Sequence, residues 1–440
     1  MNGFDALGWL DAHVNRETGV GVPAGARRGA PTLERIGVLM QYLGSPEREF
    51  PAVHVTGTNG KTTTARVLTE LLGAFGLKVG TYTSPHLTHV NERMSIDGRP
   101  IDDDELREML YAVSLVEQSI GVDPSYFEIG TAAAFRWFAD EAVDVAVIEV
   151  GLGGTWDATN VVDAHTAVVT NVSIDHVEYL GPTRDQIAAE KAGIVKPGAT
   201  LVLGETDPHL QTIFESQGAA RVVRRDADFG VKRNVLSVGG RLLDLYTPRG
   251  EYPDVFLALH GAHQADNAAI ALGAAEEFVE SALPFDVVAE ALGRVESPGR
   301  LEVVGRHPLV LLDGAHNVAG AHALRAALAE EFDAGARTLV VGLLTEKEPH
   351  EMLTALGVGE MDDAAARLIC CRPPSPRGLP ASLVARAAVD LGLDEERIEV
   401  VDAVPDAVGA ALLATPPDGQ IVITGSLYVV GAARAILVKP

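Results

Sequence analysis

Short apolar runs rich in β-branched residues alternate with helical patterns along most of the chain. The first run, Val53–Val55, leads into a glycine turn and then into a segment from about Lys61 whose apolar residues recur at helical spacing. Further runs at 79–82, 143–150 and 167–172 are typical of strands. The run at 143–150 is nearly continuous, as burial on both faces of a parallel sheet requires. The alternation therefore predicts an α/β fold whose parallel strands are joined by crossover helices.

This alternation stops between residues 219 and 259, where short strand-like pieces are broken by glycine and proline. The change predicts a small antiparallel insertion, followed by a helix from about 263 to 280. The segment 296–300 has the composition of a linker, and strand–helix alternation starts again after it. We therefore expect an N-terminal domain over residues 1–296, with a P-loop-type parallel sheet, and a smaller Rossmann-like α/β domain over residues 297–440.

Composition and charge exclude several classes of protein. Of the 440 residues, 47% are hydrophobic, so the chain can bury substantial cores and is not a disordered protein. It carries 35 basic and 61 acidic residues, a net charge of −26, which argues against nucleic acid or an anionic membrane as the main partner. No apolar run reaches the roughly 18 residues that a membrane span needs.

The compartment is predicted from two further features. Met1–Asn15 lacks the basic start of a signal peptide, and the only cysteines, Cys370 and Cys371, are adjacent. Adjacent cysteines cannot form a disulfide framework, and we interpret them as a small apolar pair at the end of a buried strand. We expect a cytoplasmic monomer.

A phosphate-binding motif lies between the first predicted strand and the first predicted helix. Its sequence is Gly57-Thr58-Asn59-Gly60-Lys61-Thr62. In this context backbone N–H groups converge on a phosphate, the helix N-terminus adds positive potential, and the lysine adds charge. The motif is shorter than the usual G-x-x-x-x-G-K-[ST], because Val55 takes the place of the first glycine. The alternative is an ordinary turn with a solvated lysine, but the strand before and the helix after favour nucleotide binding.

Polar residues end three other predicted strands of the same half. Ser84, Glu149 and Asp175-His176 each follow an apolar run. Ligands of open parallel sheets lie beyond the carboxyl ends of the strands. A Mg²⁺ ion on nucleotide phosphates needs only a few protein oxygens, and Glu149, expected as a solvated carboxylate, is the best candidate ligand. Each residue alone would more often cap a turn, but their joint placement favours a site.

The second half repeats this arrangement. Asp313–Asn317 and Thr424–Ser426 both follow predicted strands, although His316 alone could be an ordinary loop histidine. Gly151–Gly154 lacks the third glycine of a dinucleotide fingerprint, which weakens the dehydrogenase interpretation. The chain contains neither H-E-x-x-H nor G-x-S-x-G, so a zinc protease and an α/β-hydrolase also lose support.

Taken in order, these motifs resemble those of the folylpolyglutamate synthase and dihydrofolate synthase family, within the Mur ligase superfamily. The matching segments lie between about Leu33 and Gly431, so the resemblance covers most of the chain. They are Gly57–Lys61, Thr83–Leu87, Asn91–Arg93, Tyr126–Glu128, Glu149–Gly154, Asp157–Asn160, Asp175-His176, Glu190–Gly193, His263-Gln264, Asn267–Ala269, Pro298–Leu301, Asp313–Asn317 and Thr424–Tyr428.

The resemblance implies an ATP-dependent ligase that joins L-glutamate to the carboxylate of a folate or of dihydropteroate through an acyl phosphate. It also implies a role for each matching residue, including two Mg²⁺ ions. The phosphates are held by Gly57, Thr58, Asn59, Gly60, Lys61 and Thr62, and the rest of the nucleotide by Asn267, Arg300 and Asp313. The metal ligands it implies are Ser84, Glu149, His176 and a carbamylated Lys191. It places Phe127, Asp157 and Ala158 in the pterin pocket, and His316 and Ser426 where the incoming glutamate binds. The candidate catalytic residues are Lys61, Lys191 and His316.

Two departures from the family pattern leave other functions open. Thr62-Thr63 stand where the family usually has Gly-Ser, and Thr155-Trp156 stand where it often has Arg-Leu. They motivate a second hypothesis, a Mur-type ligase for a non-folate acid such as a cell-wall or specialised-metabolite precursor. A third hypothesis is a nucleotide-binding regulatory or scaffold protein without ligase chemistry. The presence of Glu149, His176, Lys191 and His316 argues against this third hypothesis, because a protein that only binds a nucleotide would not need them.

Overall fold

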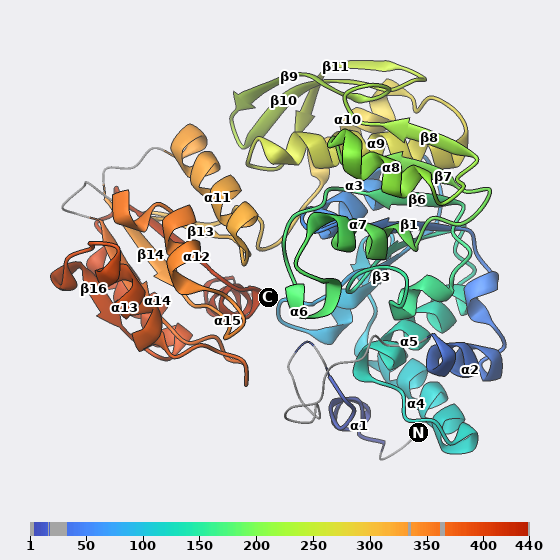
Figure 1. The fold of residues 1–440 in the computed structure, drawn as a ribbon, viewed down its shortest axis with the longest axis horizontal. Coiled ribbons are helices and arrows are strands. Elements are labelled where there is room, and N and C mark those ends of the chain that lie inside the picture. Colours follow the sequence, from blue (N-terminus) through green and yellow to red (C-terminus); the bar gives the residue numbers. More distant parts are fainter. Residues whose placement is uncertain (1–3, 16, 18–32, 333–335, 361–365, 439–440) are drawn as a thin grey trace. The chain divides into compact units, whose positions relative to one another are not determined.

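The computed structural model describes residues 4–15, 17, 33–332, 336–360 and 366–438, which fold into two compact units (Figure 1). The first unit comprises Met1–Ala258 and Gln264–Glu296, and the second comprises Leu259–His263 and Ser297–Pro440. The predicted α/β fold, with its antiparallel insertion, is confirmed. None of the helices within the described residues is both long and apolar enough to cross a membrane.

The first unit is built on an eight-stranded sheet with the order β4-β3-β2-β5-β1-β6-β7-β8. Strands β2, β5, β1, β6, β7 and β8 run parallel, whereas β3 and β4 pair antiparallel at one edge. The strands are β1 (Ala52–Thr56), β2 (Val79–Tyr82), β3 (Met94–Ile96), β4 (Arg99–Pro100), β5 (Val145–Glu149), β6 (Thr166–Val169), β7 (Thr200–Leu203) and β8 (Arg221–Arg224).

Helices cover both faces of this sheet, because right-handed crossovers that move in opposite directions place their helices on opposite sides. Helix α3 joins β1 to β2 in one direction, whereas α5, α7 and α8 precede β5, β7 and β8 in the other. The helices are α1 (Ala6–Asp11), α2 (Glu34–Tyr42), α3 (Lys61–Ala74), α4 (Asp103–Ile120), α5 (Tyr126–Asp140), α6 (Val177–Leu180), α7 (Arg184–Ala192), α8 (Pro208–Glu215), α9 (His263–Val279) and α10 (Phe285–Arg294).

The central strands are buried on both faces, which explains their continuous apolar sequence. All five residues of β5 are buried, and Ala146 and Ile148 join the core beneath α2, α4 and α5. A second core packs α7 and α8 against β6 and β7. Each fully buried valine or leucine contributes about 1.5–3 kcal/mol relative to exposure, so these cores hold the strand ends in fixed register.

The predicted antiparallel insertion forms a separate sheet in the order β11-β10-β9, labelled together in Figure 1. Its strands are β9 (Gly230–Ser237), β10 (Gly240–Tyr246) and β11 (Glu251–Leu257). The first strand of the predicted insertion, β8, instead extends the main sheet in parallel with β7. After the insertion, α9 begins at His263, close to where the helical spacing predicts.

The second unit contains a six-stranded sheet with the order β12-β13-β17-β14-β15-β16, in which only β12 is antiparallel to its neighbour. The elements of this unit are β12 (Glu302–Arg306), β13 (Leu309–Leu312), α11 (Val318–Glu331), β14 (Arg337–Val341), α12 (Pro349–Ala355), β15 (Arg367–Cys370), α13 (Ala381–Asp390), β16 (Ile398–Val400), α14 (Val404–Ala414), β17 (Gln420–Thr424) and α15 (Leu427–Leu437). Cys370 and Cys371 are buried as expected, and burial raises the pKa of both thiols to about 12, which makes them unreactive.

The short segment Leu259–His263 groups with the second unit, although the predicted boundary keeps it in the first domain. Glu331, at the end of α11, accepts a hydrogen bond from Gly261 N at 2.8 Å and contacts His260 Nδ1 at 3.1 Å. The His260 ring also packs 4.9 Å from the Phe332 ring. Side-chain contacts between distant residues therefore move this segment across the boundary, and no local pattern in the sequence reports them.

Candidate active site

Four strand ends of the first unit meet on one edge of its sheet. Strand β1 lies between β5 and β6, and β2 lies on the other side of β5. Because all four strands are parallel, the segments that follow them share the carboxyl edge. The structure therefore brings together the phosphate motif, Ser84, Glu149 and the Asp175-His176 segment.

The phosphate loop requires glycine at two positions. Gly57 and Gly60 have φ angles of 149° and 82°, which other residues rarely adopt. A Cβ atom on Gly57 would lie 1.8 Å from Thr170 Oγ1, and one on Gly60 would lie 2.3 Å from Asn267 Oδ1. Asn267 of α9 thus lies directly against the loop, at the start of α3. The loop has the glycine geometry and the helix N-terminus that phosphate binding needs.

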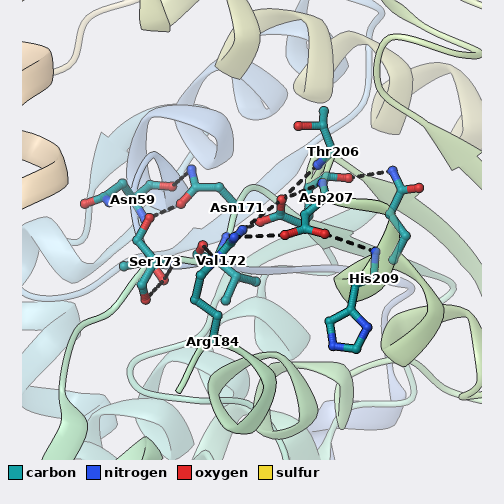
Figure 2. Close-up of polar contacts among 11 residues, drawn as sticks. Asn59, Asn171, Val172, Ser173, Arg184, Thr206, Asp207 and His209 are labelled. Carbon is teal, nitrogen blue, oxygen red and sulfur yellow. Dashed lines mark hydrogen bonds and ion pairs between the residues drawn. The ribbon is translucent and has the colours of Figure 1, made fainter. Parts of the chain in front are cut away.

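The segment after β6 holds this loop from one side (Figure 2). Asn171 contacts both backbone polar groups of Asn59: Asn59 N donates to Asn171 Oδ1 at 3.1 Å, and Asn171 Nδ2 donates to Asn59 O at 3.0 Å. Thr58 Oγ1 is 3.1 Å from Ser173 O and 3.0 Å from Ser173 N. Sequence reasoning missed Asn171 and Ser173: Asn171 lies inside the predicted strand 167–172, and Ser173 directly follows it, whereas β6 ends at Val169 and both residues lie beyond it.

Glu149 is deeply buried at the end of β5, with 1% of its surface exposed. Thr62 Oγ1 donates to Glu149 Oε1 at 3.0 Å, and Ser84 N lies 3.3 Å from Glu149 Oε2. The expectation of a solvated carboxylate is therefore wrong, because the segments after β1 and β2 close over it. The carboxylate nevertheless stays next to the phosphate loop.

The donors around Glu149 fit a Mg²⁺ ion. The Glu149 carboxylate and the Thr62 hydroxyl that contacts it are hard oxygen ligands, which Mg²⁺ prefers. Ser84, whose backbone N contacts the same carboxylate, carries a further hydroxyl. No three His, Cys, Asp or Glu side chains gather as a metal site within the described part of the chain. A metal here would therefore depend on phosphate oxygens and water for most of its ligands, as is usual for Mg²⁺ on a nucleotide.

His176 lies directly before α6 on the same edge, as the N-cap residue of that helix, with φ of 50°. Its backbone N donates to Asp175 Oδ1 at 2.8 Å, and its Nε2 lies 3.9 Å from Asp175 Oδ2. The side chain is 40% exposed, so the imidazole can reach a ligand without displacing packed atoms.

Lys191 reaches the phosphate loop from the last turn of α7. It is 4% exposed, and its Nζ donates to Gly57 O at 2.8 Å. Lys61 Nζ contacts the same carbonyl at 3.1 Å, so the two amines share one acceptor. Burial, aided by the charge of Lys61, lowers the pKa of Lys191 to about 7. A large share of this amine is therefore neutral near pH 7.

The residues predicted for the pterin pocket lie beside the Gly151–Gly154 turn. The Phe127 ring packs against Gly151, where a Cβ atom would lie 2.5 Å from Phe127 Cζ. Asp157 is buried and accepts from Leu152 N at 2.8 Å and from Thr159 N at 3.0 Å, while Ala158 is 7% exposed. Burial raises the pKa of Asp157, and its hydrogen bonds oppose that shift. Asp157 thus organises this turn, whatever else it contacts.

Thr155 connects the same turn to α7. Its N and Oγ1 both donate to Glu190 O, each at 3.0 Å, and Asn160 Nδ2 donates to Thr155 O at 3.0 Å. Trp156 packs against the core beneath α7. Thr155 therefore holds the carbonyl of the residue that precedes Lys191.

The predicted residues of the second unit also lie at neighbouring strand ends. Strands β13 and β17 are adjacent and parallel, Asp313 N donates to Ile423 O at 3.0 Å, and Gly425 N donates to Ala315 O at 3.1 Å. The Asp313 carboxylate accepts from Leu301 N and Ala315 N, each at 2.9 Å. Burial raises the pKa of Asp313, and the nearby Arg300 guanidinium opposes that shift.

His316 and Ser426 are held within these two segments. His316 Nδ1 lies 2.8 Å from Gly314 O, so this nitrogen carries the hydrogen and Nε2 is the acceptor of the neutral ring. Ser426 is 1% exposed and caps α15, because its Oγ accepts from Val429 N at 3.2 Å. A capping serine keeps its hydroxyl hydrogen available to donate.

Comparison with known proteins places this architecture in a family. The Mur ligase middle domain matches residues 55–275, and the glutamate ligase domain of Mur ligases matches residues 299–427. The chain is 40% identical over 443 residues to a dihydrofolate synthase/folylpolyglutamate synthase of Mycobacterium tuberculosis, covering 92% of this chain and 90% of that protein. It is also 35% identical to a folylpolyglutamate synthase of Lacticaseibacillus casei, over 92% of this chain and 94% of the relative.

Solved structures of folylpolyglutamate synthases agree with this family match. The M. tuberculosis folylpolyglutamate synthase complexed with ADP and AMPPCP has a TM-score of 0.87 at 40% identity, covering 93% of this chain and 96% of that chain. Escherichia coli FolC in complex with DHPP and ADP has a TM-score of 0.85 at 27% identity, covering 99% and 98%. The chain belongs to the Mur ligase family, in its dihydrofolate synthase/folylpolyglutamate synthase group.

Proposed function

We propose that this chain is an ATP-dependent ligase that joins L-glutamate to the carboxylate of a folate, or of dihydropteroate, releasing ADP and phosphate. One observation carries the proposal: a glycine phosphate loop and a buried carboxylate, Glu149, are joined by a hydrogen bond from Thr62 on one sheet edge. The relatives named as folate ligases, which match nearly the whole chain, supply the substrate class.

A carboxylate is a poor electrophile, so the reaction needs an activation step. Transfer of the ATP γ-phosphoryl group to the substrate carboxylate gives an acyl phosphate and ADP. The glutamate amine then attacks the acyl carbon, the amide bond forms, and phosphate leaves. Lys61 and the loop N–H groups stabilise the charge on the transferring group.

We assign the metal ligands to Ser84, Glu149 and His176, with two Mg²⁺ ions as the resemblance implies. When bound, Mg²⁺ neutralises phosphate charge during transfer. Glu149 contributes the negative charge that retains the cation, and Thr62 orients the carboxylate.

Lys191 completes this site as a carbamate. Its neutral amine attacks CO₂, a C–N bond forms, and one proton leaves, so that a neutral amine becomes an anion with two oxygens. Burial favours the modification because it favours the neutral amine, and the 2.8 Å contact to Gly57 O places the group beside the phosphate loop. The alternative is an exposed helical lysine paired with a nearby acid, and the burial of Lys191 argues against it.

The remaining roles follow the resemblance. Asn267, which lies against Gly60, contacts the nucleotide, as do Arg300 and Asp313. Phe127, Asp157 and Ala158 form part of the pterin pocket. In the second unit, His316 and Ser426 bind the incoming glutamate through the His316 Nε2 acceptor and the Ser426 hydroxyl hydrogen.

A panel assay of ADP release tests this function. Dihydropteroate, tetrahydrofolate and a muramyl peptide are each supplied with ATP and Mg²⁺, with and without the amino acid. Glutamate-dependent ADP release with either pterin substrate, together with the mass of one added glutamate in the product, supports the proposal. Release with the muramyl peptide alone would favour a ligase for a cell-wall precursor, and release with no acid substrate at all would contradict any ligase.

A further inference from the structure

The backbone of one residue behind the phosphate loop, Val172, is held through both its N–H and its C=O by a single ion pair (Figure 2). Val172 N donates to Glu205 Oε2 at 2.8 Å, and Arg184 Nε donates to Val172 O at 3.0 Å. Arg184 Nη2 lies 3.3 Å from Glu205 Oε1, which closes the arrangement. Both polar groups of the Val172 backbone are therefore fixed by charged side chains, and charged partners make stronger hydrogen bonds than neutral ones.

The ion pair is itself anchored to the ends of neighbouring elements. Glu205, two residues beyond β7, is 6% exposed, and its Oε1 also accepts from Thr206 N at 3.0 Å and from Asp207 N at 2.9 Å. Arg184 is the first residue of α7, and its Nη1 donates to Asp207 Oδ2 at 2.9 Å. Asp207 in turn caps α8 through His209 N at 3.0 Å.

The residues on either side of Val172 carry the phosphate loop. Asn171 exchanges hydrogen bonds with Asn59, and its carbonyl accepts from Thr58 N at 2.9 Å. Ser173 contacts the Thr58 hydroxyl. Val172 is therefore fixed by the ion pair, and its two neighbours, Asn171 and Ser173, hold the phosphate loop.

We propose that Arg184 and Glu205 are positioning residues for nucleotide binding, acting through the Val172 backbone on Thr58 and Asn59. The inference rests on the proposed function, since it takes the loop to bind ATP phosphates. Loop N–H groups that already converge bind a phosphate without a further loss of conformational freedom. Without the contacts of Arg184 and Glu205, the loop would be more mobile before binding. It would then lose conformational freedom when the nucleotide binds, and the affinity for the nucleotide would fall. Because Arg184 is 40% exposed, the ion pair by itself contributes little to stability.

Arg184→Met tests this inference, because it keeps the aliphatic stem and removes all three contacts. Binding of AMPPCP with Mg²⁺ is measured by calorimetry on the full chain, without folate or glutamate, well below the Tm of the variant. We expect Kd to rise about tenfold, which is about 1.4 kcal/mol. Amide hydrogen exchange across residues 57–62 should accelerate in the same variant.

Arg221→Met is the matched control. Arg221 on β8 makes a comparable two-contact ion pair with the buried Glu277, at 2.6 and 3.1 Å, and has no role in the proposed site. This control should change AMPPCP affinity by less than about twofold while lowering Tm by a similar amount. Equal losses of affinity in both variants would show that general destabilisation is responsible and would overturn the inference.

Two further variants make the test decisive. In Glu205→Gln combined with Arg184→Met, the affinity loss should be smaller than the product of the single losses, because both residues act through the backbone of Val172. Arg184→Lys keeps the charge but cannot form the three-way fork, and it should lie between wild type and Arg184→Met. Wild-type affinity and wild-type exchange in a folded Arg184→Met or Arg184→Lys variant would refute the inference. Failure of the wild-type chain to bind AMPPCP would instead refute the proposed function.

Discussion

Replacing Glu149 by glutamine removes the charge of the buried carboxylate and keeps its shape. The amide can satisfy both neighbours, since its oxygen accepts from Ser84 N while its NH₂ group donates to the Thr62 hydroxyl. The loss is then limited to the difference between charged and neutral hydrogen bonds, about 1 kcal/mol of unfolding free energy. For a unit of this size, that corresponds to a Tm decrease of about 2–4 °C.

The effect of Glu149→Gln on catalysis should be far larger. In the proposed site this carboxylate is the anionic ligand that retains Mg²⁺ beside the loop, and charge stabilisation by such a cation is worth several kcal/mol in a phosphoryl transfer. If about 3–4 kcal/mol of it is lost, kcat/KM falls by a factor of about 10²–10³. The activity and the stability of this variant should therefore separate clearly.

Steady-state ADP release at saturating Mg²⁺, with thermal unfolding of the same preparation, measures both effects. Glu276→Gln is a suitable control, because Glu276 is also 1% exposed and accepts hydrogen bonds from Tyr252, Thr247 and Leu283 N, away from the phosphate loop. It should lose stability and keep its kcat/KM. A Glu149→Gln variant with kcat/KM within about tenfold of wild type would refute the metal role.

Three further outcomes are expected. Lys191→Ala should lower kcat about 100-fold, because roughly 3 kcal/mol of charge stabilisation is lost. Acetate or formate should restore part of the activity by supplying oxygens. The carbamate would be contradicted if neither acid restored activity and a high-resolution map of the metal-bound enzyme showed an unmodified lysine. The pKa of Lys191 falls from 10.5 to about 7 on folding, so the unfolded state binds more protons between these pH values. In CO₂-free buffer, the Tm of the wild-type chain should therefore rise relative to that of Lys191→Met from pH 7 to 9. A Tm difference that stays constant over this range would contradict the shifted pKa. Gly60→Ala should weaken AMPPCP binding and cost about 1–2 kcal/mol of stability, because φ is 82° and the new Cβ atom would clash with Asn267. Gly37→Ala, in open space on α2, should be neutral or stabilising. Equal effects of the two substitutions would show that the loop tolerates a side chain.

The sequence predicts the central sheet well because burial on both faces demands continuous apolar runs. Strand β2 has the predicted limits, and β5 is shorter than its apolar run at both ends. The hairpin of β3 and β4 was not predicted, since these strands have three and two residues, too few for a period to show. Its existence depends on pairing with β2, which is a contact at a distance.

The candidate site also has features that the sequence predicts and features that depend on contacts between distant residues. Ser84, Glu149 and His176 could be placed on one edge because parallel strands necessarily end together. The burial of Glu149 and of Lys191 could not, since it depends on which loops close over them. Lys191 in particular lies in a helix whose sequence is mostly polar, and only the family resemblance pointed to it. Arg184 and Glu205 belong to no motif, and the role proposed for them rests on their hydrogen bonds to Val172, which only the structure shows.

The grouping of Leu259–His263 with the second unit has a practical consequence for dissecting the protein. The second unit cannot be excised as one uninterrupted stretch, because a fragment that begins at Ser297 leaves part of its own packing behind. Glu331, 3% exposed, would lose both the Gly261 amide and the His260 imidazole, and a buried carboxylate that loses such partners costs about 1–3 kcal/mol. A fragment in which residues 259–263 are joined to Ser297 through a short glycine linker would keep those contacts, and limited proteolysis that cuts only between 296 and 297 should leave the two halves associated through this segment.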